Sequence, residues 1–358
     1  MQLVASSLRV AFSWDGLPQY AALLIRAAID SLGRKCVVVG SVPHVPIKGM
    51  EEALGQPIYW IRKEQPVCWQ DLGLPVPDIF FQAGWSYPYF NALGHETKAR
   101  SGRVIGMSDA NWRGDFRQLV LGPIAFRLRL RGRFDAMMVP GSQGKMLMKY
   151  FGMLESHVHQ GLYGADPRLF NGGGRLEERP KSFLYVGQFI GRKNVLCLTR
   201  AFKEFTAKRP GWTLRLIGCG EQRDLIALDP SIIVEDFLQP GELVARYREA
   251  RFFVLPSVRE AWGLVAHEAA LCGCGLVLSD AIGSADDLGT SRNAIRFRAG
   301  NHVSLVRALI DAADRDTAWL ATADAESRAL AARFGPQRFA AEVASIVDRF
   351  ERQISSKA

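Results

Sequence analysis

Short, continuous apolar segments alternate with helical segments along most of this chain of 358 residues. In the first part of the chain, strands are predicted at 10–13, 35–40, 78–82, 103–107 and 134–139. Between the first two of these strands, apolar residues at helical spacing predict a helix that ends at Gly33. Apolar strands separated by helices indicate a parallel sheet that is covered on both faces. The alternation therefore predicts the α/β class, with doubly wound sheets.

A glycine-rich, polar segment interrupts this alternation and has the composition of a flexible linker. Further strands are then predicted at 182–187, 213–218, 232–234, 252–255 and 275–278. A chain of this length is expected to form two domains, here with a cleft between them. The predicted parts are an N-terminal domain at 1–170, the linker at 171–181, a second domain at 182–335, and a final helix at 336–358 that packs back toward the first domain.

The composition excludes several classes of protein. Hydrophobic residues make up 48% of the chain and charged residues 23%, which is typical of a globular protein rather than a disordered one. No apolar run approaches the roughly 20 residues of a membrane-spanning helix, and the first residues lack the pattern of a secretory signal. The six cysteines are scattered, as in proteins whose thiols stay reduced. We therefore expect a cytoplasmic location.

The net charge of +9 is unevenly distributed, because residues 113–149 hold eight Lys and Arg but only two Asp. The basic excess lies at Arg127, Arg129, Arg131, Arg133, Lys145 and Lys149. Such a patch can bind a phosphorylated substrate or the anionic inner surface of the cell membrane. It can also be a solvated surface without a partner. Aromatic residues do not interleave with the basic ones, so nucleic acid is not expected as a partner.

Two acidic residues, Glu260 and Glu268, flank a predicted strand-to-helix turn. Glu260 lies in the loop after the strand at 252–255, and Gly263 opens the helix that contains Glu268. Ligands of open α/β sheets bind beyond the carboxyl ends of the strands, and the amides of a helix N-terminus favour an anion. Carboxylates beside an anion site are suited to binding hydroxyl groups. This arrangement suits a ligand that is part phosphate and part polyol, such as a nucleotide-sugar.

Two adjacent cations, Arg192 and Lys193, precede the helix that follows the strand at 182–187. They are well placed to bind a diphosphate, Arg through a bidentate fork and Lys as a compact charge. Cations are unfavourable at a helix N-terminus unless an anion joins them, which favours a binding role over a solvated pair. After the next strand, Gly218-Cys219-Gly220 is a partial dinucleotide fingerprint and predicts a tight turn that lets a nucleotide approach the backbone.

These residues resemble the donor-binding half of a retaining, GT-B-fold glycosyltransferase of the large group 1 (family 4) class. The resemblance rests on Val186-Gly187 followed by Lys193-Asn194, on Leu216 to Gly220, on the Glu-x7-Glu signature from Glu260 to Glu268, and on Gly161 to Phe170. It implies two Rossmann-like domains facing across a cleft. It also implies retaining, metal-independent transfer from a UDP- or GDP-type sugar to a glycan, lipid-linked or small-molecule acceptor, as in polysaccharide or lipopolysaccharide biosynthesis.

The resemblance also assigns roles to single residues. Arg192 and Lys193 would bind the donor diphosphate and neutralise its charge as it leaves, while Glu260 would contact hydroxyls of the donor sugar. Glu268 would bind the ribose hydroxyls. The other residues expected to bind the donor are Gly16, in a loop of the N-terminal domain that closes over the diphosphate, and Gly187, Gly218, Gly220, Trp262, Gly263, Leu264 and Val265. The resemblance implies neither a cofactor nor a metal.

The chain departs from the family pattern in two places. Gln188 stands where the family often has an arginine after the glycine. In some relatives a histidine that faces the donor sugar follows the fourth N-terminal strand, whereas here the nearest histidine is the distant His95. Asp109 and Arg113 are the acceptor-side candidates that remain, although a helix-capping role is favoured for Asp109.

Two alternatives to sugar transfer stay open. A nucleotide-sugar epimerase or a phosphorylase can use the same architecture, and a non-catalytic nucleotide-sugar-binding protein or partner subunit would keep the pocket without the reaction. The pairs His157/His159 and Cys272/Cys274 are expected to be structural, because neither has a third and fourth zinc ligand at suitable spacing.

Overall fold

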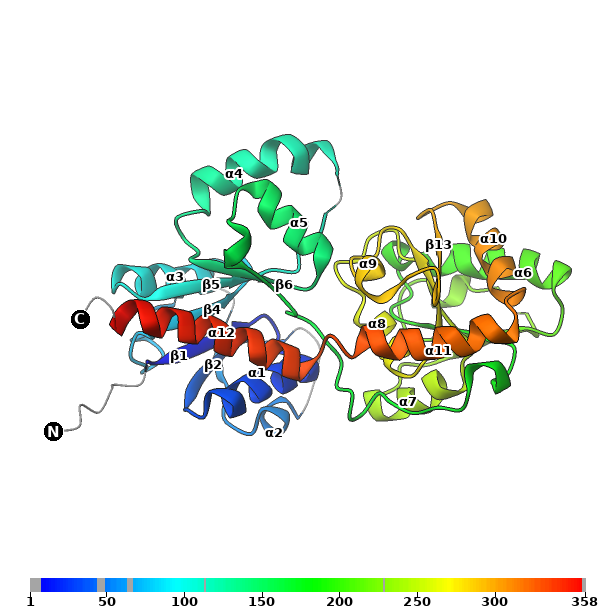
Figure 1. Cartoon of the computed structure of the whole chain (residues 1–358), viewed down its shortest axis with the longest axis horizontal. Coiled ribbons are helices and arrows are strands. Elements are labelled where there is room, and N and C mark those ends of the chain that lie inside the picture. The colour runs from blue at the N-terminus through cyan, green and yellow to red at the C-terminus, as the bar shows by residue number, and fades with distance from the viewer. Residues whose placement is uncertain (1–7, 44–48, 63–66, 113, 228, 356–358) are drawn as a thin grey trace. The chain divides into compact units, whose positions relative to one another are not determined.

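The computed structural model describes residues 8–43, 49–62, 67–112, 114–227 and 229–355. The chain divides into two compact units, each with its own parallel sheet and covering helices (Figure 1). Unit 1 comprises Met1–Gly164 and Phe334–Ala358, and unit 2 comprises Ala165–Arg333. The segment predicted as a linker, 171–181, therefore falls within unit 2.

Unit 1 contains a seven-stranded sheet with the order β3-β2-β1-β4-β5-β6-β7, in which all neighbours pair in parallel. Its strands are β1 (Val10–Trp14), β2 (Cys36–Ser41), β3 (Tyr59–Ile61), β4 (Ile79–Ala83), β5 (Arg103–Met107), β6 (Ala136–Val139) and β7 (Val158–Gln160). The order reverses between β1 and β4, because the chain first moves outward to β3 and then returns to the other side of β1. Such a switch point opens a crevice at the carboxyl ends of the two strands.

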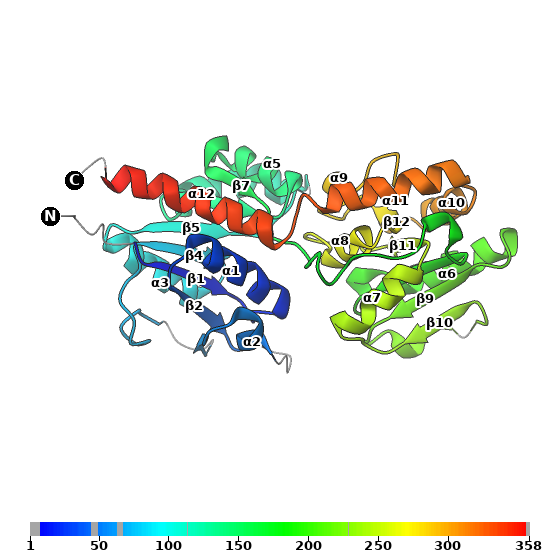
Figure 2. The same cartoon turned by 60° about the horizontal axis from the view of Figure 1, so that its bottom comes forward.

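Helices cover both faces of this sheet. They are α1 (Gln19–Leu32), α2 (Met50–Leu54), α3 (Pro88–Ala99), α4 (Gly122–Arg129), α5 (Ser142–Phe151) and α12 (Pro336–Ser355), and the π-helical turn η1 (Arg117–Leu121) leads into α4. The core on one face joins α1, α2 and α12 to the sheet, and the core on the other joins α3, α4 and α5. Figure 2 shows α12 beside α1. Helix α12 buries Phe339, Val343 and Phe350 at helical spacing, which explains why the last helix belongs to unit 1.

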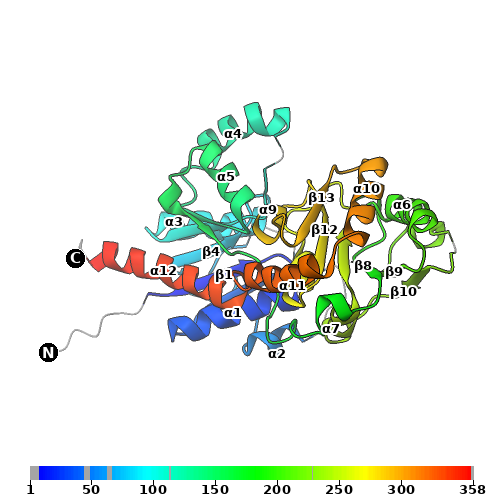
Figure 3. The ribbon, with the colours of Figure 1, turned by 45° about the vertical axis from the view of Figure 1, so that its right-hand side comes forward.

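Unit 2 contains a six-stranded parallel sheet with the order β10-β9-β8-β11-β12-β13. Its strands are β8 (Ser182–Val186), β9 (Thr213–Ile217), β10 (Ile232–Glu235), β11 (Phe252–Leu255), β12 (Gly275–Ser279) and β13 (Ala294–Phe297). Its helices are α6 (Val195–Lys208), α7 (Pro240–Glu249), α8 (Leu264–Leu271), α9 (Ala285–Leu288), α10 (His302–Ala313) and α11 (Thr317–Ala331). Figure 3 shows α6 beside α10, and α11 packs against α8. Here the strand order reverses between β8 and β11.

The predicted fold class is confirmed, since each unit is a doubly wound α/β domain. Every predicted strand is present within two residues of its expected ends, and β3, β7 and β13 are added to them. Two residues of the predicted linker are anchored in unit 2, whereas most of its other residues are exposed. Leu176 and Arg179 are buried, and the Arg179 guanidinium donates to the carbonyl oxygens of Ala250 (2.9 Å) and Cys272 (2.7 Å).

Candidate functional site

A pocket of about 260 Å³ opens beyond the carboxyl ends of β8 and β9 in unit 2. Four residues predicted to bind the donor line it, namely Gly187, Gly218, Val265 and Glu268. The rest of the lining is mainly apolar and includes Ile217, Phe237, Leu238, Pro240 and Leu243. A concave, mostly apolar surface with one buried carboxylate is typical of a small-molecule site.

Two glycines of this pocket region are required by the packing of one strand-end turn on another. A Cβ atom on Gly218 would lie 2.0 Å from the carbonyl oxygen of Gly187, and one on Gly220 would lie 2.5 Å from the carbonyl oxygen of Phe189. The same turns are joined by a hydrogen bond from Phe189 N to Cys219 O of 2.8 Å. The partial fingerprint therefore marks a close approach of two backbone segments that together form the pocket wall.

Replacing Gly218 with alanine is expected to destabilise unit 2 by about 2–4 kcal/mol, because the new Cβ collides with backbone atoms and the φ of Gly218 is +150°. Thermal unfolding should show a midpoint several degrees lower. Gly211→Ala is the matched control, since Gly211 also has a positive φ (+83°) but has no atom within 4 Å of the added Cβ. Equal destabilisation by both substitutions would contradict the close approach.

Glu268 lies on α8 and points into the pocket wall, where it is buried. The hydroxyl of Tyr247, on α7, donates a hydrogen bond of 2.7 Å to Oε2 of Glu268. Burial raises the pKa of the Glu268 carboxyl from 4.5 to about 7, while the Tyr247 hydrogen bond acts in the opposite direction. The carboxyl thus lies close to its titration point near neutral pH, and only its charged form is a pure acceptor for ligand hydroxyls.

This pKa predicts a pH dependence of stability. Between pH 4.5 and 7 the folded state retains a proton that the unfolded state has released, so stability falls as the pH rises through this window. The total loss is on the order of 3 kcal/mol. Glu268→Gln removes this contribution. Relative to the wild type, the unfolding midpoint of the variant should therefore rise as the pH increases from 4.5 to 7. Parallel profiles of the two proteins would contradict the raised pKa.

Glu260, Arg192 and Lys193 form one ion-pair cluster at the switch point of unit 2. Lys193 Nζ donates to Oε2 of Glu260, and Nη1 of Arg192 lies 3.2 Å from the same oxygen. Ser257 Oγ donates to this oxygen as well, at 3.3 Å. The two cations lie on a short 3-10 turn (Gly191–Lys193) after β8, and Glu260 lies in the loop after β11. The predicted residues are therefore together, but the carboxylate and the cations bind one another.

Helix α8 connects this cluster to the pocket. It begins after Gly263, whose φ of +89° turns the chain into the helix, and a Cβ atom on Gly263 would lie 3.4 Å from Cγ of Glu260. Leu264 and Val265 form the first turn of α8, and Val265 lines the pocket together with Glu268. The N-terminus of α8, which favours an anion, thus lies next to the cluster, while its next turns line the pocket. Trp262 is buried just before the helix.

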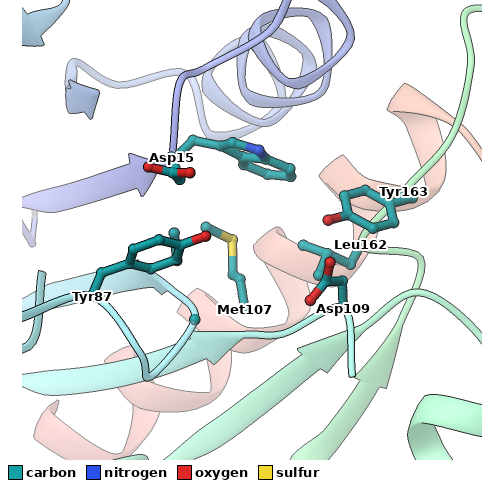
Figure 4. A pocket seen from close by; sticks show the side chains of 9 residues that line it. Asp15, Tyr87, Met107, Asp109, Leu162 and Tyr163 are labelled. Carbon is teal, nitrogen blue, oxygen red and sulfur yellow. The ribbon is translucent and has the colours of Figure 1, made fainter. Parts of the chain in front are cut away.

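A second pocket, of about 70 Å³, lies in unit 1 beyond the ends of β1, β4 and β5. Figure 4 shows Asp15 and Tyr87 on one side of this pocket and Asp109 and Tyr163 on the other. Burial, together with the negative charges of Asp15 and Asp109, raises the pKa of Tyr87 to about 12. Asp109 therefore faces a pocket at the switch point of unit 1.

The other residues of interest in unit 1 are Gly16 and Arg113, which were predicted, and Asp15, which was not. Gly16 follows Asp15 with a φ of +65°, and its N–H donates to Ser41 Oγ at 2.9 Å. Arg113 lies outside the described residues. Asp15 was not predicted as a site residue. It directly follows β1, and this place at the carboxyl end of a strand is the sequence feature that could have indicated it. Its Oδ1 accepts hydrogen bonds from Ser41 Oγ (2.5 Å) and from Tyr89 (3.1 Å).

His267, Cys272 and Cys274 are buried in unit 2. Nδ1 of the buried His267 accepts from Ala165 N (2.9 Å), and Nε2 lies 2.8 Å from the carbonyl oxygen of Ala331. Burial lowers the pKa of His267 to about 4. Among the described residues, no group of three or more His, Cys, Asp or Glu is arranged to hold a metal ion.

The match to a known protein family lies within unit 2. Residues 180–315 match the family model for group 1 glycosyl transferases. A D-inositol 3-phosphate glycosyltransferase of Corynebacterium kroppenstedtii is 30% identical over 175 residues, which cover 42% of this chain and 39% of that protein. A glycogen synthase of Mycobacterium tuberculosis is 30% identical over 185 residues, which cover 49% of this chain and 44% of that protein. The chain thus matches less than half of the length of either relative.

Solved structures are similar over nearly the whole chain. Anabaena HepE in complex with UDP and glucose has a TM-score of 0.70 at 16% identity, and the match covers 98% of this chain and 100% of that one. Sucrose-phosphate synthase of Thermosynechococcus elongatus has the same TM-score, identity and coverage. At such identities the likeness shows the fold alone. Residues 180–315 thus match the model of the group 1 glycosyl transferases, within a chain that has the two-domain GT-B fold.

Proposed function

We propose that this chain transfers a sugar from a nucleotide-diphosphate sugar to an acceptor hydroxyl. The observation that carries the proposal is the arrangement along α8, with the Arg192–Lys193–Glu260 cluster at its N-terminus and Glu268 in the pocket farther along. A diphosphate fits the first part and a nucleoside the second. HepE, which shares the fold, was solved with UDP and glucose, and this supports a UDP-type donor.

Donor binding would rearrange the ion-pair cluster. Phosphate oxygens accept bidentate and charge-assisted hydrogen bonds from Arg and Lys, so the diphosphate competes with Glu260 for Arg192 and Lys193. Released from the cations, the Glu260 carboxylate accepts hydrogen bonds from hydroxyls of the donor sugar. Glu268 accepts from the ribose hydroxyls. Without a ligand, the Glu260 carboxylate neutralises the buried Lys193 ammonium group. A buried cation without such a partner would be strongly destabilising.

The chemistry proposed is retaining and metal-independent. The bond between the anomeric carbon and the diphosphate oxygen breaks, and a bond to the acceptor oxygen forms on the same face of the sugar. The acceptor proton passes to an oxygen of the departing diphosphate. Arg192, Lys193 and the N-terminus of α8 supply the positive charge that stabilises this leaving group.

The acceptor would bind to unit 1 at the pocket lined by Asp15 and Asp109. Both charged side chains in this lining are acidic, and carboxylates accept hydrogen bonds from hydroxyls but repel phosphate and carboxylate groups. We infer that the part of the acceptor that enters this pocket carries hydroxyl groups and no negative charge. A glycan, or the saccharide end of a lipid-linked acceptor in polysaccharide or lipopolysaccharide biosynthesis, meets this requirement.

Ligand binding followed by turnover tests the function. Thermal-shift measurements with UDP-, GDP- and ADP-sugars should show a higher unfolding midpoint with one nucleotide class, because ligands that bind the folded state raise apparent stability. The selected donor should then yield free nucleoside diphosphate and a glycosylated product. If none of the three classes of nucleotide-sugar raises the unfolding midpoint, the proposal is contradicted. Binding without transfer would indicate a non-catalytic partner subunit, and formation of an epimer an epimerase.

A further inference from the structure

Helix α4 of unit 1 turns large apolar side chains toward solvent. Leu121, the last residue of η1, and Ile124 and Leu128 of α4 are 54%, 54% and 80% exposed. They follow one another at intervals of three and four residues and so share one face of the helix. The opposite face holds Phe126, which is buried against Trp85 and Phe151. The helix is thus anchored by one aromatic side chain and leaves a second apolar face without cover from unit 1.

The exposed face extends to the residues on either side and carries only positive charge. Phe116 and Val120 are exposed before α4, and Arg127, Arg129 and Arg131 are exposed in and after its last turn. Residues 116–133 contain no Asp or Glu. We define the α4 surface as Phe116, Val120, Leu121, Ile124, Leu128, Arg127, Arg129 and Arg131. Figures 1 and 3 show α4 at the outside of unit 1, packed against α5.

The combination of charge and apolar side chains decides which partner fits this surface. Contiguous exposed apolar patches mark interaction sites, and the arginines require an anionic partner. A second copy of the chain would place like charges opposite one another in a two-fold interface. Nucleic acid would satisfy the arginines but not Ile124 and Leu128. An anionic bilayer satisfies both, since its headgroups carry phosphate and the acyl boundary accepts apolar side chains.

We propose that the α4 surface docks this protein on an anionic lipid bilayer. Leu121, Ile124 and Leu128 would enter the boundary between headgroups and acyl chains, and the three arginines would pair with lipid phosphates. The proposed association is peripheral. None of the helices within the described residues is long and apolar enough to cross a membrane. The proposal goes beyond sugar transfer and does not depend on it.

Co-sedimentation of the full chain with vesicles tests the proposal. The protein should bind vesicles of phosphatidylcholine mixed with phosphatidylglycerol, and bind pure phosphatidylcholine vesicles at least ten-fold more weakly. Ile124→Glu with Leu128→Glu should reduce binding to the anionic vesicles at least ten-fold. Reversal of Arg127, Arg129 and Arg131 to Glu should reduce it about 100-fold or more. High salt should weaken binding of the wild type.

Val303→Glu and Arg307→Glu are matched controls, because both side chains are exposed on α10 of unit 2, and they should bind as the wild type does. An unchanged unfolding midpoint shows that each variant is folded. The proposal is overturned if the wild type does not bind, if it binds both kinds of vesicle equally, or if the α4 variants bind like the wild type. A dimer that Ile124→Glu with Leu128→Glu converts to a monomer would overturn it in favour of a second copy.

Discussion

Replacing Lys193 with methionine is expected to lower the rate of sugar transfer about 100- to 1,000-fold, the usual effect of removing one charge-stabilising donor from a leaving-group site. Methionine keeps most of the apolar stem of this buried side chain and removes only the ammonium group. The diphosphate then leaves with one cation fewer. Arg192 remains beside Glu260 and limits the damage to the fold. The rate is measured as release of nucleoside diphosphate at saturating donor and acceptor.

The control for this substitution is Lys203→Met. Lys203 lies on α6, away from the cluster, and its Nζ is 3.9 Å from Asp229. It should transfer sugar at the wild-type rate. If Lys193→Met retains more than a tenth of the wild-type rate while its unfolding midpoint is unchanged, Lys193 does not stabilise the leaving group.

Replacing Glu268 with glutamine is expected to weaken donor binding about 10- to 100-fold, because hydrogen bonds to a charged group contribute about 1.5–3 kcal/mol. Glutamine has nearly the same shape and can still accept the Tyr247 hydrogen bond. The loss should therefore come from the ribose hydroxyls and not from the fold. Titration calorimetry with the nucleoside diphosphate measures it above pH 7, where the wild-type carboxyl is mostly charged.

A comparison of ribose with deoxyribose isolates this contact. The wild type should bind the 2′-deoxy nucleotide more weakly than the ribonucleotide, whereas Glu268→Gln should discriminate less between them. Glu326→Gln is the control, since Glu326 lies on α11 outside the pocket, beside Arg292. Undiminished discrimination by Glu268→Gln would show that another group contacts the ribose.

The sheets were predictable because the relevant signals are local. Continuous apolar runs mark buried parallel strands, and Gly33 ends α1 in the left-handed conformation that glycine adopts readily. Strands β3, β7 and β13 were missed, and β3 and β7 have only three residues each, too few for a pattern. The segment 171–181 was predicted as a linker from its glycines. Its anchor, Arg179, bonds to carbonyl groups 71 and 93 residues away, which local composition does not reveal.

In the candidate site, too, some residues were predictable from local sequence signals and others were not. The residues around Glu260 and Glu268 were found from their place at a strand end and a helix start. The pairing of Glu260 with Lys193 joins positions 67 residues apart, so only the fold brings them together. Tyr247, which sets the environment of Glu268, lies on a different helix and has no sequence signal of its own. On α4 the sequence showed the arginines, but not that Ile124 and Leu128 face outward.

A crystal structure of the full chain with the nucleotide-sugar selected by thermal shift tests the central claim most directly. The account predicts diphosphate oxygens within hydrogen-bonding distance of Arg192 and Lys193, with Glu260 released toward the sugar. It also predicts ribose hydroxyls at Glu268 and the base among the apolar residues of the 260 Å³ pocket. A nucleotide bound elsewhere, or a Glu260 that stays paired with Lys193 while the diphosphate contacts other residues, would contradict it.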